Sequence, residues 1–119
     1  MFSRDAEGSP EYRLLCAIVA RATRDILEPG RWMRVQKQSE MVQNYLSALD
    51  WMFSDEYQWR AMRENICALL DLDVSCLQAR MLELMKHDMA KKTHDRLCAV
   101  DAQTQKEIDA RWPILAGTN

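Results

Sequence analysis

The sequence predicts an all-α fold: a single-domain bundle of four to five helices, with a helix-turn-helix-like pair at about residues 58–86. Three observations predict it. Gly and Pro number only three each among 119 residues, so residues that break helices are rare. Apolar residues recur at three- and four-residue spacing, which is the period of an amphipathic helix. Strict alternation is not sustained and β-branched residues are scarce, which disfavours a sheet.

The composition limits the class of protein. Apolar residues make up 48% of the chain and charged residues 29%, a balance typical of a globular protein. No apolar run approaches the about 20 residues of a membrane span, and the first residues lack the apolar stretch of a secretory signal. The four cysteines form no Cys-x-x-Cys pair. We therefore expect reduced thiols, a cytoplasmic location and no membrane partner.

One helical domain is expected at residues 10–112. A flexible N-terminal arm at 1–9 precedes it, and a tail at 113–119 follows. The last helix is expected to be short, at 102–111, because Pro113 cannot continue its hydrogen-bond ladder.

The first helix has clear start and stop signals. Ser9 can cap it, and Pro10 suits its first position. Glu28-Pro29-Gly30 ends it. Residues 31–38 are expected to form a loop or an irregular turn, in which Trp32 packs on the first helix.

The second and third helices follow directly. The second is expected from Ser39 to about Phe53. Ser54 can then cap the third, and two carboxylates occupy its first turn, where the helix dipole favours negative charge. The apolar residues of the third helix predict its buried side: Tyr57, Trp59, Met62, Ile66, Leu69 and Leu70.

Residues 62–85 carry the pattern that points to a function. One apolar-periodic run ends in Asp71-Leu72-Asp73 and a second run begins at once, as in a helix-turn-helix. Cys67 is small enough for the crossing of the two helices. Asp71 stands where the motif prefers Gly, and Asp tolerates the left-handed conformation better than most residues. Asp73 can cap the fourth helix.

The fourth helix departs from the motif at one anchor. Arg80 falls three residues after Leu77, where an apolar residue belongs, and Met81 follows it. The helix can continue to about Val100, with a break near Thr93. An ordinary helical hairpin needs only the same apolar stripes and the same turn, so the pattern indicates a shape before a function.

The first hypothesis is a helix-turn-helix transcription-type regulator that binds DNA. The residues expected to face the major groove are Ser75, Gln78 and Arg80. Those expected to contact phosphates are Lys86, Lys91 and Lys92. The charge distribution weighs against this hypothesis. Residues 38–73 hold seven acidic and two basic groups, a net charge of −5, within a chain of net charge −2, and such a segment repels phosphates.

The second hypothesis is a protein-binding adaptor or inhibitor. The acidic belt of residues 50–73 suits a basic partner, including a surface that normally binds nucleic acid. Methionine and tryptophan supply adaptable apolar contacts. The residues expected to contact the partner are Asp55, Glu56, Met85, Met89 and Trp112. A homodimer is left open.

Two segments also carry a resemblance. They read Trp51-Met52-Phe53-Ser54-Asp55-Glu56 and Glu64-Asn65-Ile66-Cys67-Ala68-Leu69-Leu70-Asp71-Leu72-Asp73. Residues 11–85 resemble short, largely uncharacterised bacterial and phage-borne helical proteins with an aromatic-x-x-Ser-Asp-acidic step before an Ile-Cys-x-x-Leu-x-Leu-Asp turn. The resemblance implies a small helical protein of regulatory type and transfers no catalytic residue.

No catalytic or metal chemistry is expected, and no cofactor. His94 and Cys98 are four residues apart and share a helix face. The side chains that could complete a zinc shell are Cys67, Cys76 and His87. Zinc sites usually have a close ligand pair on both sides, whereas here only one close pair exists. No nucleophile has a recognisable base beside it, so the protein is not expected to be an enzyme.

Overall fold

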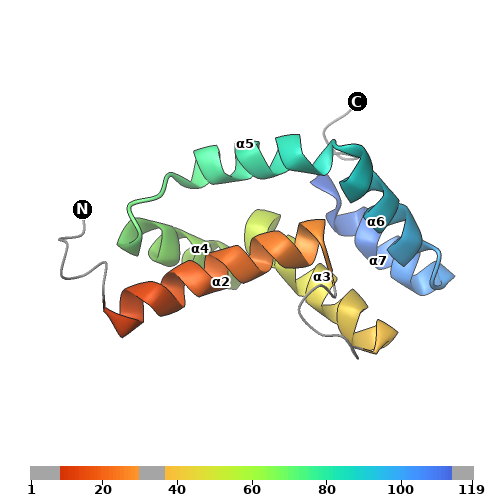
Figure 1. Ribbon diagram of the computed structural model, residues 1–119, viewed down its shortest axis with the longest axis horizontal. Helices are drawn as coiled ribbons and strands as arrows, with labels where there is room; N and C mark the ends of the chain where they lie inside the picture. The colour runs from red at the N-terminus through yellow and green to blue at the C-terminus, as the bar shows by residue number, and fades with distance from the viewer. Residues whose placement is uncertain (1–8, 30–36, 114–119) are drawn as a thin grey trace.

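The computed structural model describes residues 9–29 and 37–113, and all regular secondary structure in that part of the chain is helical. The helices (Figure 1) are α2 (Pro10–Leu27), α3 (Gln38–Phe53), α4 (Tyr57–Leu69), α5 (Val74–Met85), α6 (Asp88–Cys98) and α7 (Ala102–Arg111). The all-α fold is confirmed, but these six helices exceed the four to five expected. Residues 1–8 of the expected arm, the packing of Trp32 and tail residues 114–119 lie outside the described residues.

The expected fourth helix is divided into two, α5 and α6. Its break was expected near Thr93, but it lies at residues 86–87. The backbone N–H groups of Lys86 and His87 donate to Glu83 and Leu84, both at 3.2 Å. These three-residue bonds tighten the last turn of α5. His87 is then extended and α6 begins at Asp88, so Thr93 lies within α6. The change of direction lets both Met85 and Leu97 reach the core.

Local capping chemistry follows the sequence at two helix starts. The Ser9 side chain accepts a hydrogen bond from the Tyr12 N–H at 3.1 Å, and Pro10 occupies the first position of α2. The Asp73 carboxylate accepts from the Cys76 N–H at 3.0 Å. Both caps confirm the expectation.

The turn between α4 and α5 depends on Asp71. Its φ is +58°, and it is the residue other than Gly with positive φ in the described part of the chain. The N–H of Leu72 donates to the Cys67 carbonyl at 2.8 Å, and that of Asp71 to the Ala68 carbonyl at 3.2 Å. This pair of bonds is the Schellman motif. The left-handed conformation expected of Asp71 is therefore confirmed.

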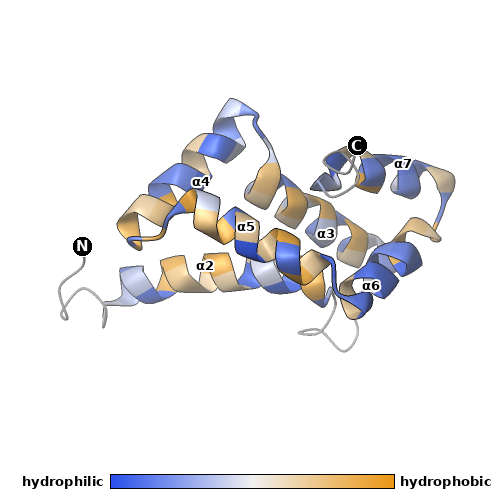
Figure 2. Cartoon of the chain, turned by 90° about the horizontal axis from the view of Figure 1, so that it is seen from above, coloured by the Kyte–Doolittle hydropathy of each residue, from blue (hydrophilic) through white to orange (hydrophobic). Residues whose placement is uncertain are grey.

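The core is built around α3, which lies against helices on several sides (Figures 1 and 2). Every described helix contributes to one cluster of buried apolar residues. The largest fully buried side chains are Tyr45, Ile26, Leu49, Met52, Met81, Met85, Leu97 and Ile108. No helix in the described residues combines the length and the apolar character needed to cross a membrane.

The C-terminal end of α3 is held by side chains from later helices. Its last carbonyls have no partner within the helix, and its last turn contains no basic residue. The guanidinium of Arg63, on α4, donates to the Trp51 carbonyl at 2.9 Å and to the Ser54 carbonyl at 3.1 Å. Arg63 is buried, so its charge is compensated by these carbonyls and by the negative end of the helix dipole.

Two further bonds join the same end of α3 to α5 and α7. The Gln78 amide, on α5, donates to the Met52 carbonyl at 2.8 Å. The Arg111 guanidinium, on α7, donates to the Asp50 carboxylate at 3.1 Å. Helices α4, α5 and α7 are thus each fixed to the last turn of α3 or to the residue that follows it.

We expect Arg63→Met to destabilise the fold by about 2–3 kcal/mol, because buried carbonyl groups lose a charged donor. Urea unfolding measures the effect. Arg60→Met is the matched control on the same helix, since Arg60 is exposed, and it should change stability by less than about 0.5 kcal/mol. Equal effects of the two substitutions would show that Arg63 does not hold α3.

Candidate functional sites

The residues predicted to contact DNA lie on two helices and differ in exposure. Five of them are exposed: Ser75, Arg80, Lys86, Lys91 and Lys92. Gln78 is not free to read bases, contrary to expectation. It is partly buried, and its amide reaches the end of α3, where it is bonded to the Met52 carbonyl. Lys91 and Lys92 belong to α6, a separate helix from α5.

The charges around the N-terminus of α5 oppose phosphate binding. In a helix-turn-helix, the first residues of the second helix approach the major groove. Here Asp71 and Asp73 are both exposed beside those residues, and like charges repel. Arg80 lies 3.4 Å from Glu83, and both side chains are about 70% exposed, so this ion pair stabilises the helix very little.

Two of the residues predicted to contact a protein partner are buried, which corrects that prediction. Met85 is inaccessible because it faces the core from the end of α5. Trp112 is buried because its ring stacks on Tyr45, with centroids 6.2 Å apart, and lies 4.1 Å from the His94 ring. Met89 is 73% exposed. Asp55 and Glu56 are exposed as well, so these three positions remain predictions.

A surface that the sequence did not reveal lies on α4 and the turn after it. Met62 is 47% exposed, Leu69 is 51% exposed and Leu72 is 43% exposed. Met62 and Leu69 are seven residues apart and therefore share a helix face. We call these three residues the α4 ridge. The expectation that Met62, Leu69 and also Tyr57 are buried was wrong, because no described helix covers this face.

Carboxylates outnumber exposed cations in the stretch of chain that carries the α4 ridge. The exposed acidic residues between positions 55 and 73 are Asp55, Glu56, Glu64, Asp71 and Asp73. The exposed basic residue in the same segment is Arg60, since Arg63 is buried against carbonyl groups. In Figures 1 and 2 the end of α4 and the start of α2 lie at the same end of the molecule, and Leu14 of α2 is exposed there too.

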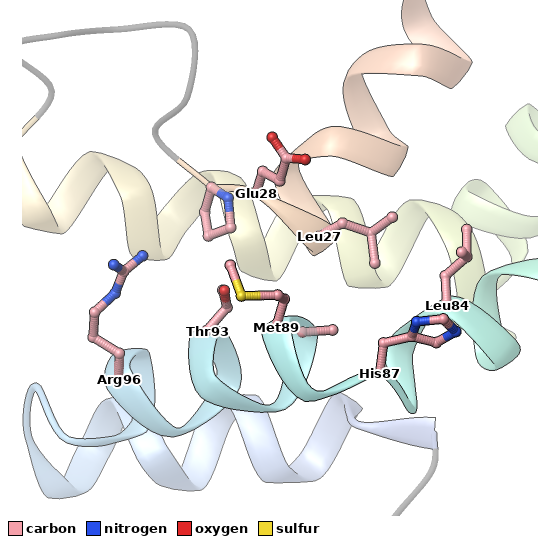
Figure 3. A pocket seen from close by; sticks show the side chains of 9 residues that line it. Leu27, Glu28, Leu84, His87, Met89, Thr93 and Arg96 are labelled. Atoms are coloured by element: carbon pink, nitrogen blue, oxygen red, sulfur yellow. The ribbon is translucent and has the colours of Figure 1, made fainter.

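An open cavity of about 630 Å³ lies between the end of α2 and the junction of α5 and α6 (Figure 3). Leu27, Leu84 and Met89 supply apolar walls, and Arg96 lies at one side. Pro29, also in the lining, is the last described residue before the gap at 30–36. The described lining residues include apolar, polar and charged side chains, and this mixture does not indicate a particular class of ligand.

A cluster of three polar side chains joins α6 and α7. His94 Nε2 lies 3.6 Å from Cys98 Sγ and 3.6 Å from Asp109 Oδ1, and Sγ lies 3.9 Å from the same oxygen. The His94 side chain is 13% exposed and that of Asp109 is 40% exposed. Only the His94–Cys98 spacing was visible in the sequence. Cys67, Cys76 and His87 are not part of this cluster.

Burial sets the protonation of this cluster. Desolvation lowers the pKa of His94, although Asp109 and Asp95 oppose it, so the neutral imidazole is favoured. Desolvation, the negative charges of Asp109 and Asp95, and the hydrogen bond to Asp109 together raise the pKa of Cys98 to about 11. Both shifts favour the uncharged forms, a neutral imidazole and a protonated thiol.

The cluster is not arranged for nucleophilic catalysis. A base that activates a thiol needs its other ring nitrogen oriented by a third group. Here Cys98 and Asp109 both face Nε2 of His94, while Nδ1 is buried without a hydrogen-bond partner. A raised thiol pKa also disfavours the thiolate that attacks.

No family model, curated protein or solved structure matches this chain.

We expect Gln78→Ala to lower the free energy of unfolding by about 1–2 kcal/mol, because the Met52 carbonyl loses its donor. Chemical denaturation measures this loss. Gln105→Ala is the control, since Gln105 is exposed on α7, and it should be nearly neutral. A neutral Gln78→Ala would instead leave this side chain available for an outside ligand.

Proposed function

We propose that this protein is a small non-enzymatic regulator that binds a protein partner through the α4 ridge. The proposed partner presents a basic amphipathic segment. One observation carries the proposal: an exposed apolar ridge with five exposed carboxylates and one exposed cation in the segment around it.

The apolar part of this surface would supply affinity. Burying the half-exposed Met and Leu side chains against a partner would contribute about 25 cal/mol of favourable binding free energy for each Å² of apolar surface removed from water. Met adapts its shape to different apolar surfaces. An apolar centre with a charged rim is the usual anatomy of a protein interface.

The carboxylates would supply partner choice. They attract a basic surface over several ångströms and speed its association, while they repel an acidic one. Arg63 opposes this bias less than an exposed cation would, because its guanidinium is buried and bonded to carbonyl groups at the end of α3.

DNA binding by a helix-turn-helix is the second candidate function. The left-handed turn at Asp71 and the exposed side chains of Ser75 and Arg80 favour it. The inward bond of Gln78 and the carboxylate of Asp73 weigh against it. We therefore place the protein partner first.

A synthetic Leu/Lys amphipathic helical peptide of about 18 residues tests the first candidate. Fluorescence anisotropy should show binding that weakens with added salt. Met62→Ser with Leu69→Ser should weaken it at least about tenfold, or about 1.4 kcal/mol, and so should Glu64→Lys with Asp71→Asn. Lys91→Ala with Lys92→Ala is the control and should leave it unchanged. If the affinity for the peptide is unchanged in both double variants, the proposal is contradicted.

A mixed-sequence DNA duplex tests the second candidate under the same low-salt conditions. We expect no retention of the duplex. Two results together would overturn the protein-partner proposal in favour of DNA. The protein would retain the duplex with an affinity that falls steeply with salt, and Arg80→Ala and Lys86→Ala would each abolish this binding.

A further inference from the structure

We propose that His94, Cys98 and Asp109 form a binding site for Zn²⁺, with three protein ligands and a fourth position open to water. The site lies between α6 and α7, away from the α4 ridge (Figure 1). It does not depend on the proposed partner binding.

The three ligand atoms already have the spacing that the ion requires. Around a tetrahedral Zn²⁺, with bonds of about 2.3 Å to sulfur and about 2.0–2.2 Å to nitrogen and oxygen, neighbouring ligand atoms lie about 3.4–3.6 Å apart. The observed separations are 3.6, 3.6 and 3.9 Å. A contraction of a few tenths of an ångström would complete the geometry.

The thiol of Cys98 makes only long sulfur hydrogen bonds to its two neighbours, and the histidine and the carboxylate are poorly placed to bond each other. The 3.6 Å between His94 Nε2 and Asp109 Oδ1 exceeds the usual N–H···O range of about 2.7–3.2 Å. Three polar side chains thus converge without a short bond between them. An ion at their centre would satisfy all three at once.

The fold holds these ligands in place. His94 and Cys98 are one turn apart on α6 and share a face, and Asp109 faces them from α7. Leu97 and Ile108, each next to a ligand in the sequence, are buried and fix the two helices. The Trp112 ring lies 4.1 Å from the His94 ring and restricts its rotation.

The chemistry of the set selects the metal. One imidazole, one thiol and one carboxylate suit Zn²⁺, whereas Mg²⁺ and Ca²⁺ prefer oxygen ligands alone. On binding, Cys98 releases its thiol proton to solvent and coordinates as the thiolate, while His94 coordinates through Nε2 and keeps its proton on Nδ1. The negative field of Asp95 and Asp109, which opposes a bare thiolate, favours a dication.

The site is expected to be weaker than a closed four-ligand zinc site. Nδ1 of His94 is buried without a hydrogen-bond partner, so it lacks the outer hydrogen bond that usually orients such a ligand. Asp109 is 40% exposed, which leaves a path for the ion to enter and exchange.

Titration of the reduced, metal-free protein with Zn²⁺ by calorimetry tests the proposal. We expect one ion per chain and a melting temperature that rises with Zn²⁺, because only the folded state brings α6 and α7 together. Co²⁺ in place of Zn²⁺ should give the visible bands of a tetrahedral site and a thiolate-to-metal charge-transfer band.

Matched variants locate the ion. Cys98→Ser should abolish the charge-transfer band, and Asp109→Asn should weaken binding at least about tenfold. Cys76→Ser and His87→Gln are the controls, since both residues are exposed outside the cluster, and neither should change the affinity. If Cys98→Ser does not fold, the test rests on Asp109→Asn alone. This variant should fold, because Asp109 is partly exposed and Asn has nearly the same shape. No Zn²⁺ binding, or binding that survives Asp109→Asn and falls in a control, overturns the proposal and leaves a polar cluster only.

Discussion

The end of α3 is the constraint on which the rest of the structure depends. A helix that ends inside a protein leaves carbonyl groups that must find donors. Here the donors come from side chains of later helices, Arg63 and Gln78, rather than from a glycine turn or a basic residue of α3. Because each donor belongs to a different helix, satisfying the carbonyls also fixes α4 and α5 against α3, and Arg111 adds α7 through Asp50.

The same bonds decide which surfaces are left for function. Gln78 is turned inward to α3, so the outer face of α5 loses a side chain that could read bases. Arg63 is turned inward as well, so exposed carboxylates outnumber exposed cations among residues 55–73. The α4 ridge stays exposed because α4 is anchored through one side and the described chain does not return across the other. These two inward side chains are the structural reason why we propose a protein partner ahead of DNA.

Much of the fold was predictable where the cause is local. Ser9 and Asp73 are caps, and Asp71 adopts the left-handed turn, because each acts on backbone groups within a few residues. Burial was less predictable, since it depends on which helices meet. Ile66 and Leu69 both look like core residues in the sequence, yet only Ile66 is covered. Neither Gly nor Pro marks the break after Met85, so packing rather than local chemistry ends α5.

The polar cluster illustrates the same limit on a smaller scale. The spacing of His94 and Cys98 places them on one helix face from sequence alone, but a pair of ligands is weak evidence for an ion. The third group, Asp109, arrives from α7, and α7 is positioned by Trp112 stacking on Tyr45 of α3 as well as by the ion pair with Asp50. The geometry of the cluster is therefore a consequence of α3, as is the exposure of the α4 ridge. Since the two surfaces share no residue, any coupling between a metal at one and a partner at the other has to pass through the helices between them, either through α3, which packs on both α4 and α7, or through α5, which contacts both α4 and α6.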